Sequence, residues 1–258
     1  MDSSKKTCLQ EVIGTLLFYA WALNSTMLVC LGTLAAAQTK GTAATTKACT
    51  QLLNYAATHP DAVVHYSARD MILKLHSDAS YLSELEAHSR AGGFHYLGND
   101  QPIVAGDPPE RPNGAILVVS NIMKMGVASA AKAELGALFF NGQEATTLRI
   151  TLLKLGHPQP ATPMQTDNVT AAGIANNTIR QRGSKAVDMR FYWIRDRVRQ
   201  GQFLIHWKPG TDNYADYFTK HHPPSHHRKI WSKYLCDRRP RQSIVPPTIA
   251  KIAIAISE

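Results

Sequence analysis

Ile72-Leu73-Lys74-Leu75-His76-Ser77-Asp78-Ala79-Ser80 is the stretch that decides how this chain of 258 residues folds. It opens with a short run rich in apolar residues and then reaches a carboxylate. Two comparable runs follow at Gly93–Leu97 and Ala115–Val119, with Gly and Pro around them. Runs of this length and composition indicate β-strands. The sequence therefore predicts three strands in succession, with an exposed loop rich in Pro, Gly and Asp between the second and the third.

Helical and strand-like segments alternate after the third strand. A helix is expected from Ala130 to Phe140, with Ser129 as its N-cap, and a further helical stretch from Leu148 to Leu155. The remaining expected elements are a strand at Pro163–Thr166, a short helix after Asn168, a helix at Lys185–Arg199, a strand at Phe203–Trp207 and a helix at Tyr214–His221. This order predicts an α/β fold with a mixed five-stranded sheet flanked by helices.

The region before the sheet has the pattern of three helices, Glu11–Leu23, Met27–Gln38 and Thr42–Thr58. It includes residues 12–39, a run of 28 residues without a charge, which is long enough to cross a bilayer. The alternative to a membrane segment is a pair of helices joined at Asn24, where polar residues interrupt the run. We expect the helix pair, without membrane contact.

The positive charge is concentrated in two segments. The formal net charge is +9; residues 179–199 hold seven Lys or Arg against two Asp, and residues 220–241 hold seven against one. Such regional basicity is typical of a surface that binds nucleic acid. The four cysteines are far apart and form no C-x-x-C pair, which argues against a zinc knuckle or a compact disulfide framework. We interpret them as reduced thiols of an intracellular protein, in either cytoplasm or nucleus.

Glu134 stands on an apolar face of its expected helix. Its neighbours three and four residues away are Ala130, Ala131, Ala137 and Leu138. An isolated buried carboxylate costs several kcal/mol or becomes protonated, so a carboxylate at this position indicates a bound cation. A partly exposed helix edge is the alternative interpretation.

Three aspartates stand at the ends of expected elements. Asp78 ends the first strand, Asp167 ends the fourth strand, and Asp216 begins the last helix. Each has a structural alternative: an Asx turn for Asp78, an N-cap for Asp167 and a favourable helix-dipole contact for Asp216. With Glu134 they form a set of four carboxylates that we expect to converge at one edge of the sheet and to bind metal.

Five short parts of the chain surround these acids. They are Leu75–Tyr81, Ser89–Gly98, Ser129–Leu135, Thr166–Asn168, and Ala215–Asp216 with Thr219–Lys220. Together they resemble the ribonuclease H of copia-type LTR retrotransposons. Residues 184–199 correspond to that family's basic helix, and residues 9–16 to the start of the thumb-like helices before the nuclease. The resemblance covers roughly residues 8–222 and implies a ribonuclease H-like fold, from the C-terminal part of a pol polyprotein.

The resemblance also implies a metal-dependent endonuclease that hydrolyses the RNA strand of RNA/DNA hybrids. The residues that correspond to the family's catalytic and metal-binding acids are Asp78, Glu134, Asp167 and Asp216. They would hold two Mg²⁺ ions, or Mn²⁺, about 4 Å apart. One ion would activate water, and the other would stabilise the leaving 3′ oxygen.

Hybrid recognition is expected to rest on phosphate contacts and on the shape of the duplex. The expected nucleic-acid-binding residues are Lys185, Arg190, Arg195, Arg197 and Arg199. The alternative function is a catalytically silent retroelement remnant that only binds nucleic acid. The paired aspartates of a polymerase palm are absent, so we expect no DNA synthesis from this chain. A polymerase domain supplied by another chain is an expected partner.

The expected domain organisation has three parts: a helical, thumb- or connection-like region at 1–71, a ribonuclease H-like domain at 72–222 and a basic, proline-containing tail at 223–258.

Cellular ribonucleases H also use a histidine in a loop before the last aspartate. His206 is the nearest candidate here, but its neighbours place it in a strand, so we expect no catalytic role. The four histidines of residues 221–227 surround Pro223-Pro224 and indicate a flexible basic linker.

Overall fold

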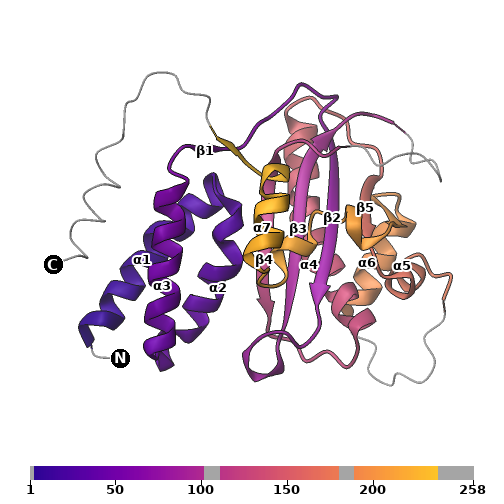
Figure 1. The fold of residues 1–258 in the computed structure, drawn as a ribbon. Coiled ribbons are helices and arrows are strands. Elements are labelled where there is room, and N and C mark those ends of the chain that lie inside the picture. The colour runs from indigo at the N-terminus through magenta and orange to yellow at the C-terminus, as the bar shows by residue number, and fades with distance from the viewer. Residues whose placement is uncertain (1–2, 102–110, 180–188, 238–258) are drawn as a thin grey trace.

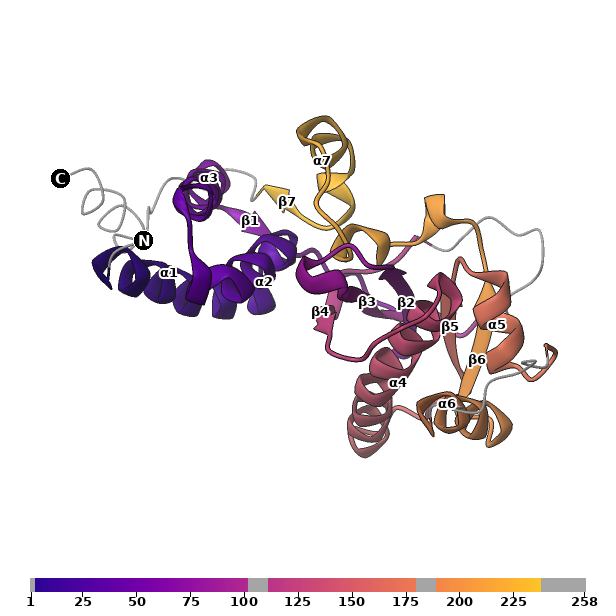
Figure 2. The same ribbon diagram turned by 90° about the horizontal axis from the view of Figure 1, so that it is seen from below.

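The computed structural model describes residues 3–101, 111–179 and 189–237, and Figures 1 and 2 show it from two directions. Three helices come first: α1 (Ser3–Ala22), α2 (Leu28–Ala37) and α3 (Ala43–Thr58). The break predicted at Asn24 is present, because α1 ends before it and a 3₁₀ turn (η1, Ser25–Met27) follows it. None of the helices in the described ranges combines the length and the apolar character that a bilayer crossing requires.

The sheet has five strands in the order β4-β3-β2-β5-β6. They are β2 (Ile72–Ser80), β3 (Ser89–Gly98), β4 (Ala115–Met123), β5 (Thr162–Thr166) and β6 (Phe203–Trp207). The first three pair antiparallel, β5 runs parallel to β2, and β6 runs parallel to β5. Parallel neighbours need crossover connections, which the helices supply. The expected mixed five-stranded sheet flanked by helices is confirmed.

One long helix, α4 (Ala130–Lys154), packs across β2 and β3 (Figure 2). The sequence predicts two helical stretches with a break between residues 140 and 148, and this prediction is wrong. The residues in between are polar or small, but tertiary contacts keep them helical. The Asn141 side-chain amide donates to Ser77 Oγ (3.0 Å) and to Gly92 O (2.8 Å), so both of its N–H groups find acceptors inside the protein.

Two shorter helices, α5 (Val169–Ala175) and α6 (Met189–Arg199), pack with α4 near β5 and β6. The side chains of Phe191 and Ile194 are buried, as the helical spacing of α6 predicts. The expected start of this helix at Lys185 lies outside the described residues.

The chain after β6 departs from the expectation. In place of a helix at Tyr214–His221 there is only a 3₁₀ turn, η5 (Asp216–Phe218). Asn213 explains the difference, because its side chain donates to Ser77 O (2.9 Å) and accepts from the Ala215 N–H (3.0 Å). These bonds hold the backbone against the sheet in a path that a regular helix would not follow.

The expectation of a flexible linker around the four histidines is also wrong. Helix α7 (Pro224–Ile230) forms there, with a proline in its first turn, where no N–H donor is needed. A short strand follows, β7 (Cys236–Asp237), and pairs antiparallel with β1 (Ala62–Val63). The described end of the chain therefore returns to the segment that leads from the N-terminal helices into the sheet (Figure 1).

The N-terminal helices and the sheet share one hydrophobic core. Its buried members include Leu28 and Leu31 of α2, Phe94 of β3, Phe218 of η5 and Tyr234 after α7. Helix α2 lies against β4, the edge strand, and the three helices form a group on that side of the sheet (Figure 1). A second core joins the other face of β2 and β5 to α4, α5 and α6.

Candidate active site

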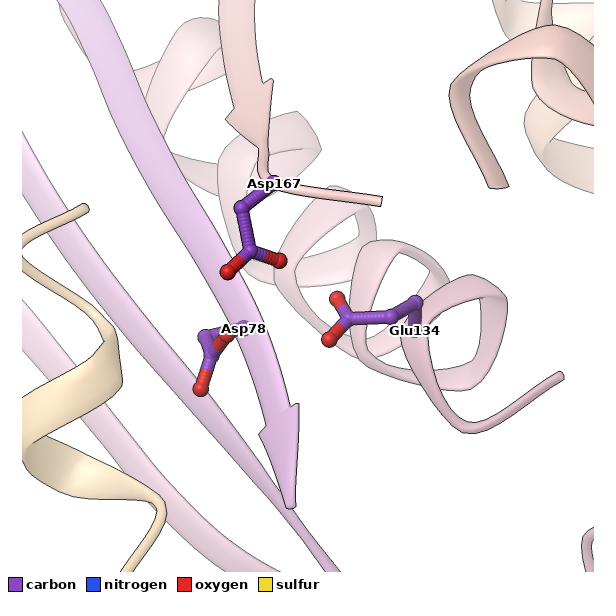
Figure 3. Close-up of side chains that lie close together, drawn as sticks. All are labelled: Asp78, Glu134 and Asp167. Carbon is purple, nitrogen blue, oxygen red and sulfur yellow. The ribbon is translucent and has the colours of Figure 1, made fainter. Parts of the chain in front are cut away.

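Three carboxylates from three different elements meet beside the sheet. Asp78 lies near the end of β2, Asp167 directly follows β5, and Glu134 lies near the start of α4. One oxygen of each lies within 4.8 Å of an oxygen of the other two, and Figure 3 shows the three side chains pointing toward one another. Because β5 is parallel to β2 and beside it, the ends of both strands reach the same edge of the sheet. The fold therefore brings together acids that lie 89 residues apart in the chain.

Hydrogen bonds hold two of the three carboxylates in place. The Ala79 N–H donates to Glu134 Oε1 (3.1 Å), and the Thr166 hydroxyl donates to Glu134 Oε2 (3.4 Å). The Thr219 hydroxyl donates to Asp78 Oδ2 (2.8 Å). Both Asp78 and Glu134 are only 5% exposed, so water does little to stabilise their charges.

Burial and mutual repulsion raise the pKa values of all three carboxyls. Burial, followed by the charges of Asp216 and Asp167, raises the pKa of Asp78 to about 7. Burial and the charges of Asp78 and Asp167 raise the pKa of Glu134 well above its ordinary value. Burial, then the charge of Asp216, raises the pKa of Asp167. Clustered carboxylate oxygens that are costly to ionise suit a hard divalent cation, which would favour their charged forms.

Asp216 lies next to this group but is not part of it. It starts η5, and its Oδ1 forms an ion pair with Lys220 Nζ at 2.5 Å. Its charge is still close enough to raise the pKa values of Asp78 and Asp167. Of the four acids expected to converge, the structure thus brings three together and leaves the fourth beside them with a lysine.

The turn that carries Asp216 approaches the sheet very closely. A Cβ atom on Gly92, which pairs with Asp78 across β2 and β3, would stand 2.6 Å from Ala215 O. Only glycine leaves room for this approach. The Ser80 hydroxyl donates to Thr219 O (2.7 Å) and further fixes the turn beside Asp78.

The expected basic helix is only partly free for contacts with phosphate. Arg190 lies 5.9 Å over the Phe139 ring and Arg197 lies 5.0 Å over the Trp193 ring, so both are half-buried against aromatic groups. Arg195 donates to the Asn177 side chain and is also half-buried. Arg199 is exposed, and Lys185 lies outside the described residues. Of the expected nucleic-acid-binding residues that the structure describes, only Arg199 is exposed.

His206 belongs to β6, as the sequence predicts. Burial lowers the pKa of its ring to about 4, so it is neutral at physiological pH. Sequence reasoning gave no role to Thr166 and Thr219, whose hydroxyls bind the carboxylates. The signal for both threonines was available, because Thr166–Asn168 and Thr219-Lys220 are among the segments that resemble the retrotransposon family.

Comparisons with known proteins show that the chain is similar in sequence to a retroelement protein. No protein-family model matches it. It is 24% identical over 155 residues to the retrovirus-related Pol polyprotein from transposon TNT 1-94 of Nicotiana tabacum. That match covers 60% of this chain and 11% of the polyprotein, so the chain corresponds to about a tenth of that relative's length.

Among solved structures, LC11-RNase H1 isolated from compost is 13% identical, with a TM-score of 0.41 over 58% of this chain and 93% of that one. The foamy viral protease-reverse transcriptase in complex with an RNA/DNA hybrid is 11% identical, with a TM-score of 0.42 over 95% of this chain and 30% of that one. Because both overlaps are loose, the sequence match and the strand order are the stronger indications. On these, the chain resembles a part of a retrotransposon Pol polyprotein, and its mixed five-stranded sheet agrees with the ribonuclease H-like fold expected from the sequence.

Proposed function

We propose that this chain is a metal-dependent endonuclease that hydrolyses the RNA strand of RNA/DNA hybrids, and that it derives from the pol polyprotein of a copia-type LTR retrotransposon. The observation that carries the proposal is the convergence of Asp78, Glu134 and Asp167 within 4.8 Å. Two buried carboxylates and a half-buried one, all with raised pKa values, destabilise a protein unless a cation binds them.

The proposed metal ligands are Asp78, Glu134, Asp167 and Asp216. Bound Mg²⁺ would activate a water molecule and stabilise the leaving 3′ oxygen. Thr166 and Ala79 orient Glu134, and Thr219 orients Asp78, so the ligands stay in place before a cation arrives. A ligand role for Asp216 requires that its carboxylate exchange Lys220 for the cation.

The proposed division of the chain places all four acids in the middle part, residues 72–222, between the helical region 1–71 and the tail 223–258. A polymerase domain from another chain is the proposed partner, because the resemblance is to a polyprotein that is much longer than this chain. One observation favours the alternative of a silent remnant that only binds nucleic acid. The ion pair between Lys220 and Asp216 already neutralises one of the four acids.

A cleavage assay on the purified chain separates these two functions. The substrate is an RNA/DNA hybrid with a labelled RNA strand, and RNA/RNA and DNA/DNA duplexes of the same sequence are the controls. We expect cleavage of the hybrid RNA in Mg²⁺ or Mn²⁺ and none in EDTA. Binding to the hybrid without cleavage, in a protein whose circular dichroism shows it to be folded, would establish the silent remnant instead.

We also expect divalent cations to stabilise the protein in the absence of nucleic acid. A cation that binds the folded state at 100 times its Kd adds about 2.7 kcal/mol, or roughly 5 to 11 °C in a protein of this size. Thermal unfolding in Mg²⁺ or Mn²⁺ is compared with unfolding in EDTA. An Asp78→Asn variant should lose the difference, and an equal shift in that variant would mean that the cation binds elsewhere.

Hybrid affinity should depend steeply on salt, and Arg199 should contribute to that dependence. Each phosphate contact that is lost reduces the slope of log affinity against log salt by roughly 0.9. We expect Arg199→Ala to reduce the slope by about this amount in EDTA, where no strand is cut. Lys47→Ala, which removes an exposed charge from α3, is the control. An unchanged slope for Arg199→Ala would show that α6 faces away from the substrate.

A further inference from the structure

A concave site lies at the opposite end of the sheet from the acids. It has a volume of about 790 Å³ and is formed by three connecting segments, residues 63–69, 111–114 and 232–237. Strand β2 begins near this cavity and reaches Asp78 six residues after Ile72. Six residues of extended strand span about 20 Å, so the cavity is separate from the acid cluster.

Hydrogen bonds and close packing fix the walls of this cavity. The Asn113 side chain accepts from the Ser67 N–H and donates to Ser67 O, both at 2.8 Å. A Cβ atom on Gly114 would stand 2.6 Å from His65 O, so only glycine allows these two segments to meet. The pairing of β1 with β7 closes the third side. The cavity therefore exists before a ligand arrives, which lowers the entropy cost of binding.

The lining of the cavity is cationic. Arg69, Arg111 and Lys233 contribute three positive charges, and Asp237 contributes one negative charge. Among the described residues, none of the three cations forms an ion pair. Within the same part of the chain, the buried Nε of Arg69 has no hydrogen-bond acceptor. A buried guanidinium N–H without a partner is unfavourable, and an anionic oxygen from a ligand would satisfy it.

The three cations belong to three different segments of the lining, which favours a ligand with several anionic oxygens. Lys233 lies over the ring of Tyr214, with its Nζ 5.3 Å from the ring centre, and the positive charge of Arg111 acts on the same tyrosine. Arg69 belongs to another wall, on the segment before β2. A single carboxylate would leave part of this charge unmatched, whereas a chain of phosphates presents oxygens to several cations in turn.

We propose that this cavity binds phosphate groups, with the sugar-phosphate backbone of a nucleic acid strand as their source. The choice of a nucleic acid rests on the proposed nuclease function, whereas the preference for phosphate rests on the cavity alone. Phosphates of one strand repeat roughly every 3.4 Å along a duplex, so the contact lies about six nucleotides from the strand position at the acids. The same chemistry would also accept a small polyphosphate.

The test uses the full chain and two phosphate probes, in EDTA so that no strand is cut. The first probe is a hybrid of about 18 base pairs, followed by fluorescence anisotropy, and the second is tripolyphosphate, followed by calorimetry. The variant carries Arg69→Gln, Arg111→Gln and Lys233→Gln. The control carries Lys6→Gln, Lys47→Gln and Lys154→Gln, which removes the same charge from exposed positions elsewhere.

We expect the cavity variant to bind the hybrid at least about tenfold more weakly than the control variant, with a slope against log salt reduced by roughly two units or more. Asp237→Asn removes the one acid among the described residues of the lining and leaves the cations intact. It should tighten binding, which a loss of folding would not do. If the cavity variant loses tripolyphosphate binding but keeps its affinity for the hybrid, the cavity is a phosphate site for a small ligand. Equal binding of both probes by all variants would overturn the proposal. Because no cleavage is measured, this outcome is independent of whether the chain is a nuclease.

Discussion

Replacing Glu134 with glutamine is expected to lower the rate of hybrid cleavage at least about a thousandfold and to stabilise the folded protein when no divalent cation is bound. Metal ions contribute several kcal/mol of transition-state stabilisation, and each 1.4 kcal/mol is about a factor of ten in rate. An amide keeps the shape of the side chain and its bond from the Ala79 N–H, but it removes a charge from the proposed metal site. The same change relieves the burial and repulsion that raise the pKa of Glu134.

Two measurements are needed, because the variant should move activity and stability in opposite directions. Cleavage is measured in Mg²⁺, and thermal unfolding is measured in EDTA, where each kcal/mol gained raises the midpoint by roughly 2 to 4 °C. The matched control is Glu144→Gln, on the exposed side of the same helix, which should change neither quantity. A Glu134→Gln protein that cleaves within tenfold of the original chain would remove Glu134 from the metal site. A lower midpoint in EDTA would show that its hydrogen bonds outweigh the cost of its charge.

Replacing Arg90 with methionine is expected to destabilise the protein by about 3 to 5 kcal/mol, because the change leaves Glu84 without the partner of a buried ion pair. Arg90 is completely buried. Its Nε donates to Glu84 Oε1 at 2.7 Å, its Nη1 donates to Ser120 Oγ at 3.2 Å, and its Nη2 donates to Thr33 Oγ1 at 3.3 Å. One side chain thus joins β3 to β4, to the loop after β2 and to helix α2.

The midpoint temperature of thermal unfolding should fall by roughly 6 to 20 °C in Arg90→Met. The control, Arg228→Met on the exposed side of α7, should leave the midpoint unchanged. Gly32→Ala tests the contact between Arg90 and helix α2 from the side of the helix, because its Cβ would stand 2.7 Å from Arg90 Nη1. We expect it to lower the midpoint in the same direction and by a smaller amount. A midpoint for Arg90→Met within about 2 °C of the original would mean that the desolvation of this ion pair cancels its attraction.

The hydrogen bonds of Arg90 also connect the N-terminal helices to the candidate active site. The Ser120 hydroxyl, which accepts from Arg90, donates to Phe218 O (2.8 Å) in the turn that begins with Asp216. The Thr33 hydroxyl, which also accepts from Arg90, is 3.1 Å from Nε2 of His221, three residues after that turn. The helices before the sheet therefore hold the segment that positions the fourth acid.

The amino-acid sequence by itself determined the elements that follow from local pattern. The runs that begin at Ile72, Gly93 and Ala115 became antiparallel strands, and the alternation after residue 129 became helices with two parallel strands. Once the strand order is known, Asp78 and Asp167 must reach one edge of the sheet, and their distance in the chain does not matter.

Only the tertiary structure decided the features that depend on contacts between residues far apart in the chain. Asn141 continues α4 because it finds partners on β2 and β3, and Asn213 prevents a helix at Asp216 because it binds the sheet. Arg90 is a charged residue, yet it is completely buried, because Glu84, Ser120 and Thr33 accept hydrogen bonds from its guanidinium. Local periodicity carries no information on such partners, since a polar residue has the same helical or strand propensity whether or not a distant group completes its hydrogen bonds.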